Sequence, residues 1–234
     1  MNPAILRIGI SACLLGEKVR YDGGHKRDAL IMEHLGPYLT FIPVCPEVEL
    51  GMGVPREPVR LERSGRGVRM VGATTGTDHT AAMTRFAERR AAGLEALDLS
   101  GYVFKKNSPS CGPGGVPIHG RGRATRSGRG LFAAALRDRM PLLPVVDESE
   151  LADRSGQERF LERVRAYRRL RDFFSGRWTV EGLVQFHALE RSRLRKRRAD
   201  LDRLVARAHS LPRATLAARY EGAFMGALAQ PLLR

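Results

Sequence analysis

The sequence lacks any run of apolar residues that approaches the ~20 needed for a helix to span a membrane. A polar loop follows the first apolar residues at once, which is unlike the layout of a secretory signal peptide. Cysteine is also rare: the chain has only three, and an odd number leaves one over in any disulfide framework. We therefore expect a cytoplasmic protein whose cysteines are free thiols.

Lysine is scarce, since only five of the forty basic residues are Lys and the others are Arg. The formal net charge is +15, and such an excess is typical of proteins that bind a polyanion, above all nucleic acid. Two simpler explanations stay open: a codon bias that raises the Arg content, and a basic surface that is merely solvated. The charge is therefore supporting evidence only.

The composition changes after Asp147, where helix-forming residues begin to dominate. Residues 151–234 carry 19 Lys and Arg against 9 Asp and Glu, a net charge of +10, whereas residues 1–150 carry 21 against 16, a net charge of +5. A chain of 234 residues is long enough for two small domains. We predict a boundary near 148–156 that separates a first domain, residues 1–150, from a small basic all-α domain, residues 151–234.

Strands and helices alternate in the predicted first domain. Apolar runs predict strands at 5–11, 39–44, 101–105 and 141–146, and capped or periodic segments predict helices at 28–35, 78–97 and 130–138. This order predicts an α/β fold, with a mainly parallel sheet and helices on both faces. We also expect a hairpin over 58–71 and a mobile, basic, glycine-rich loop over 119–130.

Each cysteine follows a predicted strand: Cys13 the first, Cys45 the second and Cys111 the third. The carboxyl ends of parallel strands meet at one edge of a sheet, where α/β proteins bind their ligands. We therefore expect the three thiols to lie together. Lys105 and Lys106, with two nearby serines, predict a lowered pKa for the Cys111 thiol and a readiness to bind metal.

The spacing of the cysteines limits the metal chemistry. They are 32 and 66 residues apart with no Cys-x-x-Cys pair, which excludes a zinc ribbon or an ordinary ferredoxin motif. Three thiolates can hold a 4Fe-4S cluster that leaves one iron open, a Lewis acid with high affinity for sulfur. Zinc on three cysteines, with His25 or His119 as a fourth ligand, is a competing interpretation. A third is three unrelated cysteines packed as small apolar residues.

Four motifs carry a resemblance to a known family. Residues 11–16 with 19–23, then Cys45-Pro46-Glu47 with Pro55-Arg56, then Lys106 and Ser108–Gly112, resemble the thiouracil desulfidase family in the same order. The similarity covers roughly residues 5–147. It implies a 4Fe-4S cluster on Cys13, Cys45 and Cys111, and removal of sulfur from a thiocarbonyl of uracil without redox chemistry.

The resemblance also implies roles for two further residues. Glu47 matches the family's acid–base carboxylate and Ser108 its assisting serine, and a carboxylate beside a cluster is suited to deprotonating water. Glu49, on the same loop, is an alternative candidate for the base. Without a catalytic role, Glu47 would be a charge at a helix N-terminus or on the surface, and Ser108 would be a hydroxyl that stabilises a turn. Tyr21, Asp22 and Arg56 are expected to shape the pocket or to anchor its loops.

Residues 157–228 resemble the YbgA-like helical domain of two-domain relatives, in a shortened form that ends at Arg234. This implies action on 4-thiouridine, including within tRNA, and a net charge of +10 fits phosphate contacts. The basic run at 195–198 is a candidate contact, whereas His187 is expected to be a core or capping histidine. Two rivals stay open: a desulfidase of free thiouracil, and a non-catalytic, metal-containing RNA-binding module.

Overall fold

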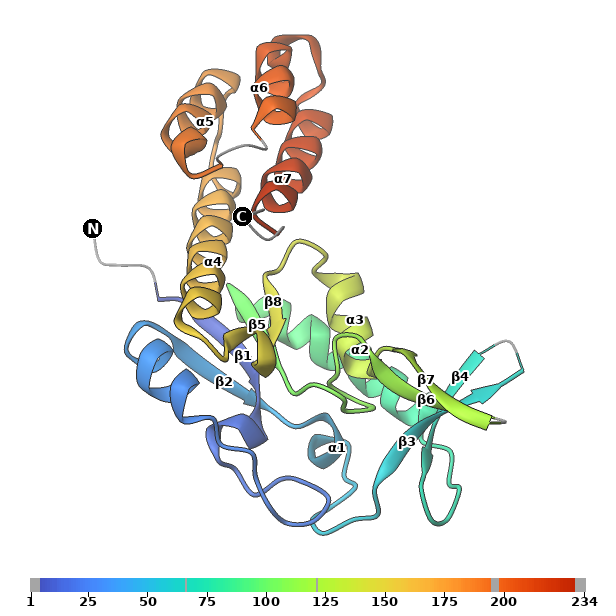
Figure 1. Cartoon of the computed structure of the whole chain (residues 1–234). Coiled ribbons are helices and arrows are strands. Elements are labelled where there is room, and N and C mark those ends of the chain that lie inside the picture. The colour runs from blue at the N-terminus through green and yellow to red at the C-terminus, as the bar shows by residue number, and fades with distance from the viewer. Residues whose placement is uncertain (1–4, 66, 121, 195–197, 230–234) are drawn as a thin grey trace. The chain divides into compact units, whose positions relative to one another are not determined.

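The computed structural model describes residues 5–65, 67–120, 122–194 and 198–229 (Figure 1). The chain forms two compact units, Met1–Leu161 and Glu162–Arg234, and they divide inside helix α4 (Arg154–Ser175). The domain limits predicted from composition, near residue 150, stay a prediction. No helix in the described ranges is long and apolar enough to cross a membrane.

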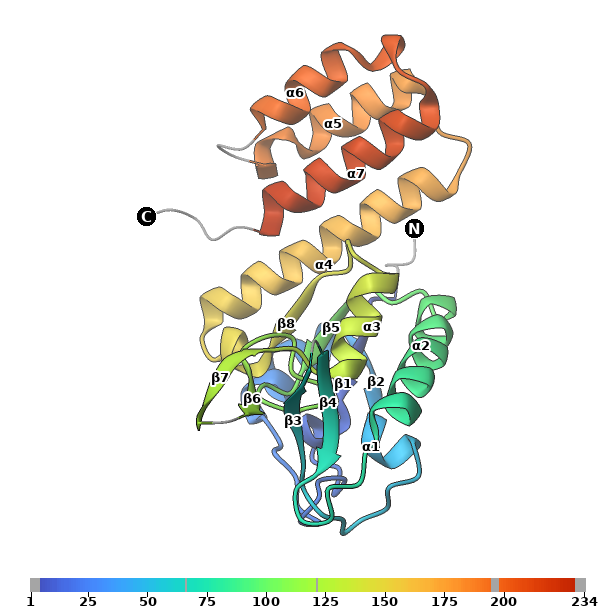
Figure 2. The same ribbon diagram turned by 90° about the vertical axis from the view of Figure 1, so that its right-hand side faces the viewer.

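A sheet of four parallel strands lies at the centre of the first unit (Figure 2). Its order is β2-β1-β5-β8, with β2 at Thr40–Val44, β1 at Arg7–Ser11, β5 at Gly101–Phe104 and β8 at Val145–Asp147. The central strands are apolar and buried, as parallel strands covered on both faces require. Gly9 in β1 is required because a Cβ there would lie 2.3 Å from the Tyr102 ring. The predicted α/β fold with a parallel sheet is confirmed.

Helices α2 (Thr80–Ala96) and α3 (Leu131–Arg139) pack against each other beside this sheet (Figure 2). Both were expected from the sequence, and the Asp78 carboxylate accepts the N–H of Thr80 at the start of α2 (2.8 Å). The helix predicted over 28–35 is confirmed, since residues 29–35 are helical and the Asp28 carboxylate accepts the Ile31 N–H (3.2 Å) at its start. Its last five residues form a π-helical turn, η2 (Ile31–Leu35), and a 3₁₀ turn with Pro37, η3 (Gly36–Tyr38), follows.

A second sheet stands beside the first and has the order β4-β3-β6-β7. Its strands are β3 (Val59–Ser64), β4 (Gly67–Gly72), β6 (Val116–Gly120) and β7 (Gly122–Gly128). The predicted β3–β4 hairpin is confirmed. The loop predicted over 119–130 is wrong, because most of this segment belongs to the antiparallel β6–β7 hairpin. Strand β6 pairs with β3, and Val116 and Ile118 both face the core, while the Arg residues of β7 face solvent.

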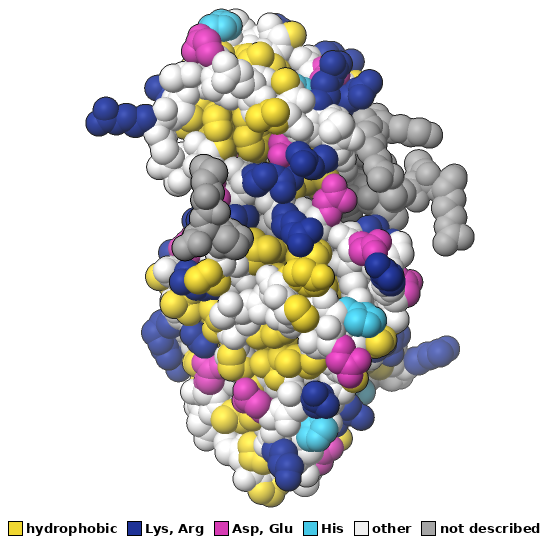
Figure 3. Space-filling model, turned by 90° about the vertical axis from the view of Figure 1, so that its left-hand side faces the viewer, with side chains coloured by type: hydrophobic (Ala, Val, Ile, Leu, Met, Phe, Trp, Pro, Cys, Tyr) yellow, Lys and Arg dark blue, Asp and Glu magenta, His cyan; other side chains and the backbone are white. Residues whose placement is uncertain are grey.

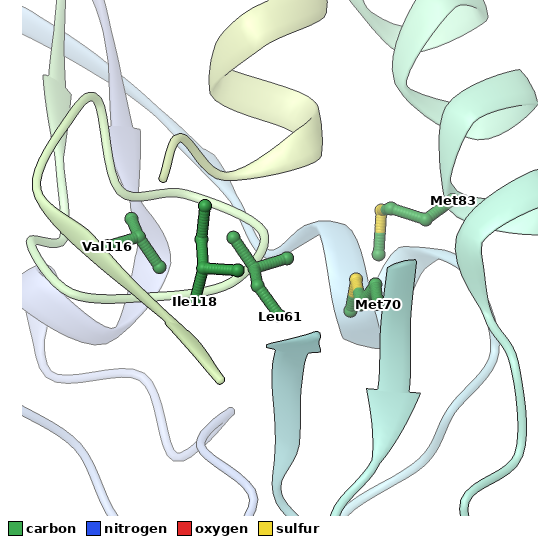
Figure 4. Close-up of a cluster of buried hydrophobic side chains, with 5 residues drawn as sticks. All are labelled: Leu61, Met70, Met83, Val116 and Ile118. Carbon is green, nitrogen blue, oxygen red and sulfur yellow. The ribbon is translucent and has the colours of Figure 1, made fainter. Parts of the chain in front are cut away.

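The second sheet packs against helix α2 through a cluster of buried side chains (Figure 4). Its members are Leu61, Met70, Met83, Val116 and Ile118. Leu61 and Val116 also line the cavity described below. The cluster therefore fixes one wall of that cavity.

The second unit is helical, as predicted. It contains the later part of α4 with α5 (Val180–Leu194), α6 (Ala199–Ala206) and α7 (Arg213–Ala229). His187 is buried, with its two ring nitrogens 3.1 Å from Tyr220 Oη and 2.8 Å from Asp202 Oδ1. It is the core histidine that the sequence predicts.

Truncation of Leu61 to Ala is expected to lower the free energy of unfolding by about 2–5 kcal/mol, because it leaves a cavity in a cluster that cannot collapse freely. Urea unfolding of the metal-free protein measures this loss. Leu97→Ala is the control, since Leu97 is 42% exposed whereas Leu61 is 0% exposed. Equal losses for the two variants would show that the cluster does not stabilise the second sheet.

Candidate active site

The ends of three parallel strands place the three cysteines around one cavity. Strand β1 lies between β2 and β5, so their carboxyl ends are neighbours. Cys13 lies in the 3₁₀ turn after β1, Cys45 between β2 and helix α1 (Pro46–Glu49), and Cys111 in the loop after β5. All three line a cavity of about 400 Å³. The predicted convergence of the thiols is therefore present in the structure.

The lowered pKa predicted for Cys111 is wrong. Burial raises the pKa of the Cys111 thiol well above its ordinary value, and the nearby Glu47 charge raises it further. Burial, with the charge of Cys45, raises the pKa of Cys13 to about 11, and burial also raises the pKa of Cys45. The Lys105 ammonium that was expected to favour the thiolate is paired with Glu148. In the metal-free protein these cysteines are therefore neutral thiols near pH 7.

The donor set fits a cluster better than a single ion. In the described part of the chain, no three His, Cys, Asp or Glu side chains are grouped as a single metal ion requires, and the zinc alternative needs such a group. His119 lines the cavity, but His25 does not. In an iron–sulfur cluster each thiolate binds a different iron, so the ligands surround the cluster. Three thiols around one cavity match that arrangement.

Glu47 also lines the cavity, and both of its carboxylate oxygens are held. Arg56 donates to Oε2 from Nε (2.9 Å) and Nη2 (2.5 Å), and Ser110 Oγ donates to Oε1 (2.7 Å). Arg56 also donates to the carbonyl oxygens of Val19 (3.0 Å) and Gly53 (2.9 Å). The side chains of Glu47 and Arg56 are only 12% and 6% exposed. Charge-assisted hydrogen bonds in such a setting fix the carboxylate firmly.

Ser108 lies at the cavity and makes no hydrogen bond to Glu47 among the described contacts. Its Oγ accepts the backbone N–H groups of Cys111 (3.1 Å) and Ser110 (3.3 Å), and lies 3.0 Å from Ser110 Oγ. Ser110, one of the two serines near Cys111 in the sequence, is the serine that touches the carboxylate. The Ser-Pro-Ser spacing was the available signal, since it places two hydroxyls on one tight turn.

The remaining candidate residues differ in whether they line the cavity. The rival base Glu49 accepts the Cys45 N–H (3.1 Å) and pairs with Arg90 (2.8 Å), so it has a structural role outside the cavity lining. Tyr21 lines the cavity and Asp22 does not. Asp22 instead pairs with Arg20 at 3.2 Å and accepts the Gly24 N–H, which anchors the loop.

Comparison with known proteins agrees with this geometry. Residues 8–148 match the sequence model of the 2-thiouracil desulfurase family. The chain belongs to this family. It is similar to the solved structure of the 4Fe-4S-dependent thiouracil desulfidase TudS, with 35% identity, a TM-score of 0.52, and coverage of 62% of this chain and 93% of that one.

A second relative is the uncharacterized protein YbbK of Bacillus subtilis (strain 168). It is 30% identical over 149 residues, which is 62% of this chain and 97% of YbbK. The predicted membership of the desulfidase family is thus confirmed. The family match ends at residue 148, so the YbgA-like resemblance of the following helices stays a prediction.

Alkylation of Cys13 by iodoacetamide in the metal-free protein is expected to become about tenfold faster with each pH unit up to about pH 9.5. The reason is that a thiol whose pKa is about 11 is still largely protonated there. Peptide mass spectrometry gives the rate at Cys13, and glutathione in the same reaction is the control. A rate at Cys13 that levels off near pH 8.5, the ordinary pKa of a thiol, would contradict the raised value.

Proposed function

We propose that the protein is a 4Fe-4S-dependent desulfidase that removes sulfur from a thiolated uracil base. One observation carries the proposal: three cysteines and a firmly held carboxylate, Glu47, line a single cavity. The relative TudS is described as a 4Fe-4S-dependent thiouracil desulfidase. In this chain Cys13, Cys45 and Cys111 would hold the cluster. Its assembly would displace the protons of three thiols, two of them buried and that of Cys45 half-buried.

The cluster, when bound, supplies a Lewis-acidic iron that attracts the substrate sulfur and polarises the C=S bond. The residues of the chain handle the water. Glu47 takes a proton from the water whose oxygen attacks the thiocarbonyl carbon, and then returns a proton as sulfur leaves. Ser108 either hydrogen-bonds to the substrate or passes the proton to or from it. The thiocarbonyl and water become a carbonyl and hydrogen sulfide, and no electron donor is needed because sulfur stays at one oxidation level.

The size and surroundings of the cavity support a nucleotide-like substrate. A volume of about 400 Å³ suits a small ligand such as a pyrimidine base. A neighbouring hollow is lined by Arg60, Glu62, Arg63, His119 and Gly120, and it shares Arg60 and His119 with the cavity. Glu62 pairs with Arg60 there, and the hollow keeps an excess of basic side chains. Basic side chains beside a base site are suited to the phosphates of a nucleic acid. We therefore propose 4-thiouridine in tRNA as the substrate, and free thiouracil as the alternative.

The hairpin β6–β7 is the strongest candidate for RNA contact in the first unit. Arg126 Nη2 donates to Asn107 Oδ1 (2.7 Å), so the hairpin touches the loop that carries Ser108 and Cys111. On the face shown in Figure 3, Lys and Arg side chains are interspersed with acidic and apolar ones. Of the basic run predicted to contact RNA, residues 195–197 lie outside the described residues.

Protein reconstituted anaerobically with iron and sulfide is expected to remove the thiocarbonyl absorbance of 4-thiouracil and to release one sulfide per base. Glu47→Gln is expected to be about 10²–10⁴-fold slower, because it loses the acid–base group, and to keep its cluster. Glu88→Gln is the control, since Glu88 lies on an exposed face of α2. Full activity in Glu47→Gln, or an unchanged band with a loaded cluster, would refute the proposed mechanism.

The tRNA part is tested by Arg63→Glu and Arg123→Glu. Each is expected to slow desulfuration of 4-thiouridine in tRNA and to reduce the salt dependence of tRNA binding by about one unit of slope. Activity on free 4-thiouracil is expected to stay unchanged in both. Arg85→Glu on the exposed side of α2 is the matched control.

Two results would favour the alternatives. If the Arg63→Glu and Arg123→Glu variants act on tRNA as the native protein does, free thiouracil is the better substrate assignment. If RNA binds tightly while no thiolated base is ever converted, the protein is a metal-containing RNA-binding module.

A further inference from the structure

The hydroxyl of Ser110 is buried, with the residue 1% exposed, and it lies between Ser108 and Glu47. Ser108 Oγ is 3.0 Å from Ser110 Oγ, and Ser110 Oγ is 2.7 Å from Glu47 Oε1. Ser108 and Glu47 make no direct hydrogen bond in the described contacts. Among the described residues, Ser110 is therefore the side chain that joins them.

We propose that Ser110 is a positioning residue of the desulfuration reaction, and that it makes Ser108 and Glu47 one hydrogen-bonded unit. This proposal rests on the function proposed above. Ser110 does not act on the substrate in this account. It acts through Glu47, by fixing the oxygen that Arg56 does not hold.

The direction of the hydrogen bonds follows from the number of hydrogens available. Ser110 has one hydroxyl hydrogen, and its contact with Glu47 Oε1 (2.7 Å) is far shorter than its contact with Cys111 Sγ (3.7 Å). The hydrogen therefore points to the carboxylate, which can only accept. The Ser108 hydroxyl already accepts two backbone N–H groups, so its own hydrogen is free to point to Ser110 Oγ. The chain runs in one direction, from Ser108 through Ser110 to Glu47.

The backbone holds Ser110 in this position. Its carbonyl oxygen accepts the N–H groups of Phe132 (3.0 Å) and Ala133 (3.2 Å), at the start of helix α3. Gly130 is required beside it, because a Cβ there would lie 2.4 Å from the Ser110 oxygen. A serine whose backbone is fixed by the start of a helix is well placed to orient a carboxylate with its hydroxyl, and orientation of a catalytic group contributes strongly to rate.

Ser100, in the same unit, provides a control for the loss of a buried serine hydroxyl. Ser100 is equally buried, at 1% exposed, yet its Oγ has no hydrogen-bond partner in the described structure. Ser100→Ala therefore removes a buried hydroxyl without touching Glu47. It reports what the loss of such a hydroxyl does on its own.

The first test measures desulfuration of 4-thiouracil by cluster-loaded Ser110→Ala, with iron and sulfide contents determined for each sample. The kcat is expected to fall about 10- to 100-fold, the range for loss of a hydrogen bond to a charged group. The KM is expected to stay unchanged because Ser110 does not hold the substrate. Ser100→Ala is expected to match the native protein. A Ser110→Ala enzyme with native kcat, or one whose loss lies in KM, would overturn the proposal.

The second test does not depend on a folded Ser110 variant. It compares Ser108→Ala, Glu47→Gln and the double variant. If Ser110 joins the two residues into one unit, Ser108→Ala has little further effect in the Glu47→Gln background. Rate losses that multiply in the double variant would show that the two residues act independently, and would overturn the proposal.

A third readout separates this proposal from the proposed function. In the metal-free protein, the melting-temperature loss of the double variant Ser110→Ala with Glu47→Ala is expected to be smaller than the sum of the two single losses, because each variant removes the same Ser110–Glu47 hydrogen bond. If no thiolated base is converted by the native loaded protein, the proposed function fails, whatever this cycle shows. Additive melting-temperature losses would instead remove the contact on which the Ser110 proposal rests.

Discussion

The parallel pairing of β1 with both β2 and β5 is the constraint on which the site depends. Each of these strands is followed by one cysteine, and their shared direction brings the three loops to the same edge of the sheet. Gly9 allows the Tyr102 ring to pack across β1, so the central strands can be fully buried. The cavity exists because the chain must turn away from the sheet at these three ends. The second sheet then closes one side of it, through Leu61 and Val116.

Burial gives the site its chemical character. It raises the pKa of all three thiols, so the metal-free protein keeps them protonated, and a cluster must displace three protons on binding. Glu47, by contrast, is held by hydrogen bonds: Arg56 donates to one carboxylate oxygen and Ser110 to the other. The cavity is therefore lined by three neutral thiols and by a carboxylate whose position is fixed by hydrogen bonds. Arg56 connects that carboxylate to the loops of Val19 and Gly53, which hold it against the walls of the cavity.

Local sequence patterns were sufficient for much of this account. Buried parallel strands read as apolar runs, so the strand ends and the cysteines after them could be placed. The β6–β7 hairpin could not, because its pairing with β3 joins Leu61 to Ile118 across a long stretch of chain and its Gly and Arg residues are typical of loops. The pKa of Cys111 was predicted in the wrong direction, since burial and the pairing of Lys105 with Glu148 arise only in the folded chain. The contact between Ser110 and Glu47 spans 63 residues, and no periodicity reports it.

The most direct test of the central claim, that three cysteines from three strand ends hold one cluster, is Mössbauer spectroscopy of protein reconstituted anaerobically with ⁵⁷Fe and sulfide. The account predicts about four irons and four sulfides per chain, with one iron distinct from the other three and altered by 4-thiouracil. It also predicts loss of the cluster on single replacement of Cys13, Cys45 or Cys111 by Ser. A mononuclear iron spectrum, or a cluster that survives any one of these replacements, would contradict it.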